Sequence, residues 1–319
     1  MQKLVSAILT RNEADRYLPE VLDSCGRFGR VVLLDDGSTD QTRELCRDHP
    51  AVVAYRHRAG PPAWGAESSA RAELWDLARE YGEWVLFCDA DQLLVGDPRP
   101  LTSVVDANAW SFILYDLWND RQHYRDDGFW RAHHHPRPWL VCPDRVPGGW
   151  LPEWPARGIH CGHIPGNFPF RAVVAPPDTH HWLHLGYVKE EDRGAKLQRY
   201  HAVSSQLSDF ERAHADSIAS PPTLRRLPAE TPIKVLIGAP VRKRVDVLSA
   251  YLQALDWQEL PPRVEVSYCF VSDYTSDDLG EKVLKDFVAD HSGVVLQPAV
   301  RPPEGDFSDA DPVTHRWTQ

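Results

Sequence analysis

Short apolar runs alternate with amphipathic segments over the first hundred residues, and this pattern restricts the fold more than any other feature. Buried strands are expected at residues 4–9, 31–34, 52–55 and 84–88. Apolar residues at helical spacing predict helices between them, at residues 18–25, 39–47 and 70–81. Strands that alternate with helices in this way predict an α/β, Rossmann-like fold, in which a mostly parallel sheet carries helices on both faces.

Polar residues follow three of the expected strands directly. Ligands of parallel sheets bind at the carboxyl ends of the strands, so residues at these points are the candidates for a site. They form the segments Thr10-Arg11-Asn12-Glu13, Asp35-Asp36-Gly37-Ser38 and Asp89-Ala90-Asp91. We expect the three segments to meet at one edge of the sheet.

Asp89 and Asp91 stand two residues apart at the end of a strand. In a segment that stays extended, both carboxylates point to the same side. Mg²⁺ and Mn²⁺ prefer oxygen ligands and commonly take one or two carboxylates from a protein. One aspartate would then hold the metal, and the other a ribose hydroxyl or a bound water. An ordinary acidic turn is an equally good interpretation of this pair taken alone.

Two adjacent acids, Asp35 and Asp36, end the second expected strand. Strand-end carboxylates are suited to accept hydrogen bonds from a base or from ribose hydroxyls. Gly37, directly after them, permits a tight turn with positive φ.

The segment that follows the first strand has two interpretations. Asn12 is either the N-cap of the next helix, with Glu13 in its first turn, or a member of a nucleotide pocket together with Thr10 and Arg11.

The composition changes after residue 100. Six of the twelve tryptophans lie between Trp110 and Trp154, and nine of the fifteen histidines lie between His123 and His184. Long loops held by aromatic side chains are expected in this part, followed by charged helical sequence at 185–215. A first domain at 1–215 is therefore predicted, with a nucleotide-binding part at 1–100 and an acceptor or closing part at 101–215.

A serine- and proline-rich segment at 216–232 predicts a linker. Past it, at 233–319, the opening order of strand, helix, strand, acid, helix and strand returns, with Asp273 as the strand-end acid. The repeat stops before an equivalent of Asp89-Ala90-Asp91. We therefore expect a truncated second α/β unit without a catalytic centre.

The overall charge and the apolar pattern restrict the partners. A net charge of −11 makes binding of duplex nucleic acid an unlikely role. No run of 18 apolar residues occurs, so no transmembrane segment is predicted. The six cysteines show no paired spacing, which is typical of free thiols in the reducing cytoplasm.

Three motifs, in this order, resemble family 2 of the glycosyltransferases, which have the GT-A fold. They are AILTRNEADRYLPEVLDSC, VVLLDDGSTDQT and EWVLFCDADQLL, and the resemblance covers about residues 3–95. The later stretch HWLHLGYVKEEDRGAKLQRY is similar to the closing segment of the family, where a histidine followed by a basic helix approaches the diphosphate or the metal.

The resemblance implies roles for individual residues. Asp35 or Asp36 would bind the base and ribose. Asp89 and Asp91 would hold Mn²⁺ or Mg²⁺ at the diphosphate, with His184 as a third ligand. The full set implied for the nucleotide-sugar donor is Thr10, Arg11, Asn12, Glu13, Asp35, Asp36, Arg71, Asp89, Ala90 and Asp91. Arg71 is nearly as well explained as a solvated arginine, and Gln92 stands where many relatives carry a further acid.

The implied activity is transfer of a sugar, with inversion, from a UDP- or GDP-sugar to a hydroxyl group of a glycan, a lipid or a small molecule. A base must remove the proton of that hydroxyl. Glu153 is the first candidate, because aromatic neighbours would raise the pKa of its carboxyl group. Trp150 and Trp154 are candidates for stacking on the acceptor sugar, or else anchor the core. The other candidates for the base are Asp116, Asp127 and Asp178.

Three alternatives remain open. A zinc-dependent enzyme would use histidines of the segments His133-His134-His135, His160-Cys161-Gly162-His163 and His180-His181-Trp182-Leu183-His184. A nucleotidyltransferase would show a glycine-rich basic loop after the first strand, which TRNEAD is not. A non-catalytic carbohydrate- or nucleotide-binding protein of the same fold suits the second unit better than the first.

Overall fold

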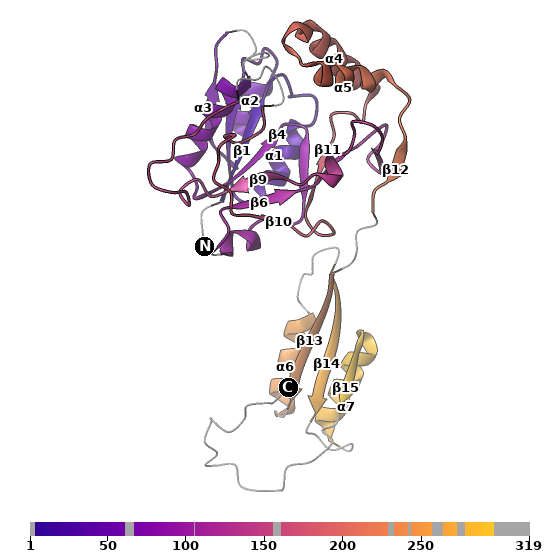
Figure 1. The fold of residues 1–319 in the computed structure, drawn as a ribbon. Coiled ribbons are helices and arrows are strands. Elements are labelled where there is room, and N and C mark those ends of the chain that lie inside the picture. The colour runs from indigo at the N-terminus through magenta and orange to yellow at the C-terminus, as the bar shows by residue number, and fades with distance from the viewer. Residues whose placement is uncertain are drawn as a thin grey trace. The chain divides into compact units, whose positions relative to one another are not determined.

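The computed structural model describes most of the chain. The described residues are 4–60, 67–104, 106–155, 161–228, 233–241, 244–256, 264–272 and 278–296. They fall into two compact units, Met1–Ala229 and Glu230–Gln319 (Figure 1).

The first unit is built on a seven-stranded sheet with the order β10-β6-β9-β4-β1-β2-β3. Of these seven strands, only β9 runs antiparallel to its neighbours. The strands are β1 (Leu4–Thr10), β2 (Arg30–Asp35), β3 (Val52–His57), β4 (Trp84–Asp89), β6 (Ala109–Phe112), β9 (Arg137–Val141) and β10 (Ala172–Val174). The predicted α/β fold with a mostly parallel sheet is confirmed.

Helices cover both faces of this sheet, as predicted. Alternate residues of β1 enter different cores because successive strand side chains point to opposite faces. Ile8 packs in the cluster that contains α1 (Leu18–Gly26), whereas Val5 packs in the cluster that contains α3 (Glu67–Arg79). The α3 face is closed by Trp75, which is fully buried and stacks on Phe87 at 5.5 Å between ring centroids. Each such side chain contributes about 1.5–3 kcal/mol by leaving water.

The first unit contains further strands and helices outside the large sheet. A second, three-stranded sheet has the order β5-β11-β7, in which β11 pairs with both other strands. Its register sets His184 beside Asp116. These elements are α2 (Thr42–Asp48), β5 (Gln92–Val95), η1 (Pro100–Ser103), β7 (Leu114–Asp116), β8 (His123–Arg125), η2 (Ala132–His134), β11 (His181–His184), α4 (Glu190–Ala202), η3 (Ser204–Gln206) and α5 (Asp209–Asp216).

The linker predicted at 216–232 is wrong for most of its length. Within it, η4 (Ser217–Ala219) buries Ile218 in an aromatic cluster, and β12 (Leu224–Arg226) pairs antiparallel with β8. The Ser217 hydroxyl accepts a hydrogen bond from Trp130 Nε1 at 3.0 Å. A few specific contacts therefore hold a segment whose polar composition resembles that of a linker. Residues 229–232 lie outside the described part.

The second unit is a three-stranded parallel sheet with the order β13-β14-β15 and two helices. Its elements are β13 (Ile233–Val241), α6 (Val245–Asp256), β14 (Val264–Ser272), α7 (Leu279–Asp290) and β15 (Gly293–Leu296). This is the same sequence of elements and the same strand order as β1 to β3 of the first unit, which agrees with the repeat seen in the sequence. Asp273, the predicted strand-end acid, lies outside the described residues.

No helix in the described part of the chain has the length and apolar character needed to cross a membrane. All six cysteines are free thiols, and five of them are buried.

Candidate functional site

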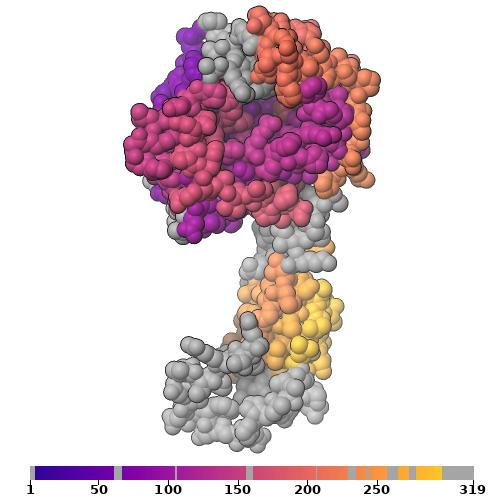
Figure 2. Space-filling model, viewed as in Figure 1, coloured from indigo at the N-terminus to yellow at the C-terminus, as the bar shows by residue number. Residues whose placement is uncertain are grey.

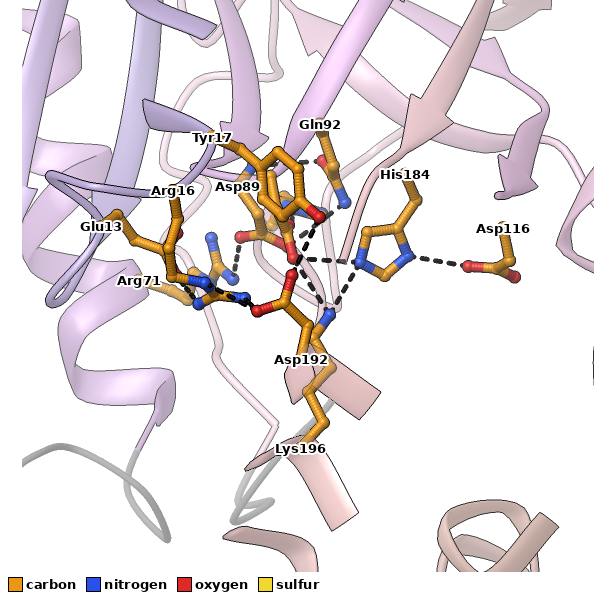
Figure 3. A network of polar contacts seen from close by, with 12 residues as sticks. Glu13, Arg16, Tyr17, Arg71, Asp89, Gln92, Asp116, His184, Asp192 and Lys196 are labelled. Atoms are coloured by element: carbon orange, nitrogen blue, oxygen red, sulfur yellow. Dashed lines mark hydrogen bonds and ion pairs between the residues drawn. The ribbon is translucent and has the colours of Figure 1, made fainter. Parts of the chain in front are cut away.

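The three polar segments singled out in the sequence meet at the carboxyl edge of the large sheet. β1 lies between β2 and β4, and its register places Thr10 opposite Asp35 and Leu9 opposite Asp89. In the space-filling view, the surface of the first unit is hollowed beside the salmon-coloured helices, and dark violet atoms of the amino-terminal half lie at the bottom of the hollow (Figure 2). The side chains of this edge form one network of polar contacts (Figure 3).

Asp91 is the centre of a buried cluster of opposite charges. Its Oδ2 lies 3.0 Å from Lys196 Nζ and 3.3 Å from His184 Nε2. The other ring nitrogen of His184, Nδ1, lies 2.7 Å from Asp116 Oδ1. Three elements thus converge on the turn after β4, because Asp116 ends β7, His184 ends β11 and Lys196 lies on α4.

These contacts determine the charges of the cluster. Burial would raise the pKa of Asp91, but Lys196 and His184 hold it well below its ordinary value. Burial and the charge of Lys196 lower the pKa of His184, yet Asp91 and Asp116 outweigh them and raise it to about 9. The ammonium group of Lys196 also lies 3.0 Å from His184 Nε2. The ammonium group of Lys196 and the Nε2 proton of His184 therefore compete for the same oxygen of Asp91, Oδ2.

Asp91 and His184 fit a divalent cation. Because Asp116 holds Nδ1, the Nε2 atom of His184 faces Asp91, the arrangement in which a histidine ligand is oriented by a carboxylate behind it. One carboxylate oxygen and one imidazole nitrogen suit Mn²⁺ or a similar first-row ion. The position that such an ion would take between them is the one that Lys196 Nζ approaches.

A glycine keeps this position open. A Cβ atom on Gly186 would lie 2.2 Å from Asp91 Oδ2 and 2.2 Å from Lys196 Nζ. Such distances are far below van der Waals contact, so any other residue at this position would displace the pair.

Asp89 faces a different set of partners. Its Oδ1 accepts a hydrogen bond from Arg71 Nη2 at 2.6 Å, and its Oδ2 lies 3.3 Å from Gln92 Nε2 and 3.2 Å from His163 Nε2. Burial would raise the pKa of Asp89, but Arg71 and His163 hold it well below its ordinary value. Residues 90 and 91 form a turn, so Asp89 and Asp91 do not belong to one extended segment, the condition on which their common orientation was expected.

Of the two acids at the end of β2, Asp35 is fully buried and its oxygens are engaged. Oδ1 accepts hydrogen bonds from the amide and hydroxyl of Ser38, and Oδ2 accepts them from Tyr55 and from His57 Nδ1. Burial opposes its charge, but these donors lower the pKa of Asp35. This aspartate braces the turn, in which Gly37 has φ 76° as predicted. Asp36, paired with Arg58 at 2.9 Å, is the better candidate for contact with a ligand.

Asn12 is not the N-cap of a helix, because α1 begins six residues later, at Leu18, with Tyr17 at its N-cap. Instead the Asn12 side-chain oxygen accepts a hydrogen bond from the backbone N–H of Thr39 at 2.7 Å. The backbone N–H of Asn12 donates to Ser38 Oγ at 2.8 Å. These bonds join the loop after β1 to the loop after β2, and so connect two of the three segments that form the candidate site.

The loop after β1 is also joined to α4. Tyr17 donates a hydrogen bond to Asp192 Oδ2 at 2.8 Å, and Arg16 Nη2 lies 2.9 Å from Asp192 Oδ1. Arg16 Nη1 in turn contacts Glu13 Oε1 at 2.5 Å. Arg16 and Tyr17 therefore hold the helix that carries Lys196, and Glu13 of the strand-end segment is connected to it through Arg16.

Several buried polar atoms at this edge have no hydrogen-bond partner among the described residues. They are Thr10 Oγ1, Glu13 Oε2 and Arg71 Nη1. Leaving a buried polar group unpaired costs about 1–3 kcal/mol, and native proteins rarely do so without a reason. Donors and acceptors of this kind, gathered at one edge, indicate a site for a polar ligand.

Glu13 gives the site a measurable pH signature. Burial, and after it the charge of Asp91, raise the pKa of Glu13 from 4.5 to about 7. Between these values the unfolded chain loses a proton that the folded protein retains, so stability falls as pH rises from about 4.5 to about 7. The replacement Glu13→Gln removes this loss, which amounts to at most about 3 kcal/mol.

Urea unfolding of the wild type and the Glu13→Gln variant at pH 5 and pH 8 tests this. The variant is expected to gain about 2 kcal/mol over the wild type on going from pH 5 to pH 8. The matched control is Glu20→Gln, whose exposed side chain pairs with Arg121 on the surface. An equal difference between wild type and Glu13→Gln at both pH values would show that Glu13 ionises normally.

The aromatic residues predicted to bind the acceptor have a different position. Trp150 and Trp154 pack edge-on against Trp75, at 6.3 and 6.2 Å between ring centroids, and Trp150 Nε1 donates to the carbonyl oxygen of Asn167. Both tryptophans thus anchor the loop after β9 to the α3 face. Both side chains are half-buried, so they remain candidates for stacking on an acceptor sugar.

The four candidates for the base differ in exposure and in their partners. Glu153 is exposed, so its carboxyl group lacks the aromatic enclosure that was expected for it. Asp116 serves His184, and Asp127 is bound to Arg125 Nε at 3.0 Å and to the amide of Thr223. Asp178 is exposed.

The sequence did not single out Lys196, Gly186, Arg16 or Asp192 as parts of the site. The only signal for Lys196 was its place in a basic helix after His184. Arg71 contacts Asp89 and Glu67 at 2.6 and 2.7 Å and is 6% exposed, so it is not a solvated arginine.

The histidine-rich segments proposed for zinc are dispersed. His163 lies at Asp89, His184 at Asp91, and His180 at the carbonyl oxygen of Asp97. His160 lies outside the described residues.

Comparisons with known proteins place this geometry in a family context. Residues 7–97 match the family described as glycosyl transferase family 2. Two curated mycobacterial proteins, Uncharacterized protein Rv3786c of Mycobacterium tuberculosis and Uncharacterized protein Mb3815c of Mycobacterium bovis, are each 34% identical to this chain over 214 residues. The matches cover 61% of this chain and 49% of each relative, so the chain spans about half the length of the curated relatives it matches.

Solved structures of similar fold include TarS 1–349 of S. aureus in complex with UDP, at 18% identity and a TM-score of 0.40, covering 68% of this chain and 69% of that one. Another is the mannosyltransferase PcManGT of Pyrobaculum calidifontis in complex with GDP-Man and Mn²⁺. It has 16% identity and a TM-score of 0.37, and the match covers 68% of this chain and 70% of that one.

Proposed function

Since residues 7–97 belong to glycosyl transferase family 2, we propose that this chain is a glycosyltransferase that moves a sugar from a nucleoside-diphosphate sugar to an acceptor hydroxyl with inversion. The observation that carries the proposal is the convergence on Asp91 of His184, Asp116 and Lys196, at a sheet edge where buried polar atoms lack partners. This is an edge built to receive a charged, polar ligand.

The residues divide into two groups by the part of the donor that they suit. Thr10 Oγ1 and Glu13 Oε2 are unpaired at the edge formed by β1 and β2, beside Asp36, and are proposed to contact the nucleoside. Arg71 Nη1 and Lys196 Nζ are the buried cations nearest the two aspartates, and are proposed to contact the diphosphate.

In the proposed reaction, the acceptor oxygen forms a bond to the anomeric carbon while the bond from that carbon to the diphosphate oxygen breaks. The diphosphate leaves with the electron pair, so negative charge increases where Lys196 and Arg71 lie. A divalent cation held by Asp91 and His184 would add Lewis-acid stabilisation of the same charge. The acceptor proton passes to a carboxylate.

Glu153 remains the proposed proton acceptor, now because of its position and its exposure and no longer because of aromatic neighbours. Its loop is held beside the start of α3 by a hydrogen bond from Ser68 to the carbonyl oxygen of Pro155. Its exposed carboxylate is accessible to an acceptor hydroxyl.

A ligand screen tests the function. Thermal unfolding of the full chain is measured with UDP, GDP and their sugars, each with and without Mn²⁺ or Mg²⁺. One nucleoside diphosphate at a hundred times its Kd is expected to stabilise by about 2.7 kcal/mol, a shift of several degrees, with a larger shift when the metal is present. Absence of a shift with every nucleotide would overturn the proposal.

Lys196 provides a second measurement on the same site. Replacing it by Met removes the ammonium that approaches the position between Asp91 and His184, so binding of Mn²⁺ to the free protein is expected to tighten about tenfold, or 1.4 kcal/mol. Titration calorimetry with Mn²⁺ measures this. The control is Lys189→Met, which removes the same charge from the exposed start of α4. Equal affinities in the wild type and Lys196→Met would show that lysine and metal do not share this position.

A further inference from the structure

A second group of ligand-bearing side chains lies outside the proposed active site. Asp126 follows β8, and His133 and His134 belong to η2. One carboxylate oxygen and one nitrogen from each ring lie within 4.8 Å of one another. The sequence offered His133 and His134 among the candidate zinc ligands but not Asp126, which only the fold brings beside them.

His133 is the residue that makes this group more than a surface cluster. Its side chain is only 7% exposed, and its Nε2 has no hydrogen-bond partner among the described residues. Nε2 lies 3.3 Å from Asp126 Oδ1, yet it is not aligned to donate a hydrogen bond to it. His133 Nε2 is thus a buried nitrogen that faces a carboxylate without a hydrogen bond to it. A cation bound between the two atoms would satisfy both.

Aromatic packing fixes the direction of this nitrogen. The His133 ring stacks on Tyr115, at 5.8 Å between centroids and an interplanar angle of 12°, and meets Tyr124 edge-on at 4.7 Å. A ring held on two sides in this way cannot turn its nitrogen towards solvent without losing both contacts. The packing therefore preorganises His133 as a ligand.

We propose that Asp126, His133 and His134 bind a first-row transition ion, with zinc as the expected occupant. Two ligands at about 2.1 Å from a tetrahedral zinc are roughly 3.4 Å apart, close to the 3.3 Å between Asp126 Oδ1 and His133 Nε2. His134 Nε2, at 3.9 Å from the same oxygen, lies on a 60% exposed side chain that is free to adjust. Two imidazoles and one carboxylate favour zinc over Mg²⁺ or Mn²⁺.

The surroundings indicate a structural role for such an ion. Asp126 also pairs through Oδ2 with Arg225 of β12, the strand that pairs with β8 near the end of the first unit. An ion on Oδ1 would therefore connect η2 to the paired strands β8 and β12. The guanidinium on the second oxygen weakens the attraction for a cation, so moderate affinity is expected rather than the very tight binding of a four-ligand site.

The test uses the metal-free full chain and Co²⁺ and Zn²⁺ as probes. Co²⁺ is expected to give the visible absorption of a histidine-bound ion, and Zn²⁺ to displace it and raise the unfolding temperature by several degrees. His134→Ala, an exposed position that does not affect the core, is expected to weaken Zn²⁺ binding about 10–100-fold. His133→Ala is expected to do the same.

The matched control is His135→Ala, which removes the neighbouring exposed histidine and is expected to leave Zn²⁺ binding unchanged. An Asp91→Asn variant separates this site from the proposed active site, and should retain Zn²⁺ binding at Asp126, His133 and His134. Equal loss in His134→Ala and His135→Ala, or loss in Asp91→Asn alone, would overturn the proposal, as would the absence of any Zn²⁺ effect on the wild type.

Discussion

Replacing Asp91 by Asn is expected to reduce sugar transfer about a thousandfold, the range found when a charge-stabilising group is removed from an active site. The amide keeps the shape of the side chain but removes the negative charge that Lys196 and His184 face at 3.0 and 3.3 Å. A neutral amide is also a poor ligand for a hard cation. Both effects act on the position where the diphosphate and its counter-ion are proposed to bind.

The variant is also expected to lose stability. Removing one partner of a buried ion pair costs about 3–5 kcal/mol when the other charge is left alone. Here Asp116 stays beside His184, so a loss at the lower end of that range is expected. The protein should remain folded at 25 °C, because the core clusters around β1 and β4 do not depend on this side chain.

The measurements are donor hydrolysis and sugar transfer with and without Mn²⁺, together with thermal unfolding of each variant. Asp97→Asn is the matched control, since it removes an aspartate that pairs with Arg99 and is 41% exposed. It is expected to retain activity within about twofold. The proposal would be contradicted if the Asp91→Asn variant transferred sugar within tenfold of the wild-type rate and still responded to Mn²⁺. The metal and the groups that stabilise the diphosphate charge would then lie elsewhere.

The sequence was sufficient to predict the sheet edge because local signals mark it. Thr10, Asp35 and Asp89 each follow an apolar run directly, and a parallel sheet brings the ends of such runs together. The alternation of cores along β1 follows from the same periodicity of two. Arg71 was named through the resemblance to the family, and the structure places it against Asp89.

Lys196 and the pairing of His184 with Asp116 escaped prediction because the partners come from distant parts of the chain. Lys196 is 105 residues from Asp91, and Arg16 and Tyr17 hold its helix α4 through Asp192. Likewise, β11 pairing sets His184 beside Asp116, across 68 residues. Neither relation has a sequence period or a spacing that marks it.

Composition was a weaker guide than the strand ends. It could not show that Trp150 and Trp154 pack edge-on against Trp75 and are half-buried there. The proline- and serine-rich segment at 216–232 was expected to be a linker, yet Ile218 and the strand β12 fix it to the first unit. The amino-acid composition of a segment describes its average polarity, whereas its position is determined by contacts of a few individual side chains.

Replacing Gly186 by Ala is expected to lower sugar transfer and metal-dependent nucleotide binding about a hundredfold while the fold is preserved. The backbone of Gly186 is not in the left-handed region, so alanine brings no conformational strain. Its Cβ would instead lie 2.2 Å from both Asp91 Oδ2 and Lys196 Nζ. Both atoms are at the ends of side chains, which can move aside without disturbing the backbone, but only by separating the pair.

A single methyl group therefore distinguishes two explanations of the Asp91 cluster. If the cluster only stabilises the fold, Gly186→Ala should lower the unfolding temperature and leave activity roughly in proportion to the folded fraction. If it binds the diphosphate and its metal, activity and nucleotide affinity should fall much further than stability. Gly194→Ala is the control, since nothing lies within 4 Å of a Cβ at that position of α4 and alanine stabilises a helix by about 1 kcal/mol over glycine. Nucleotide titrations and unfolding curves on the two variants decide between these explanations, and equal activities in both would remove Asp91 and Lys196 from the proposed mechanism.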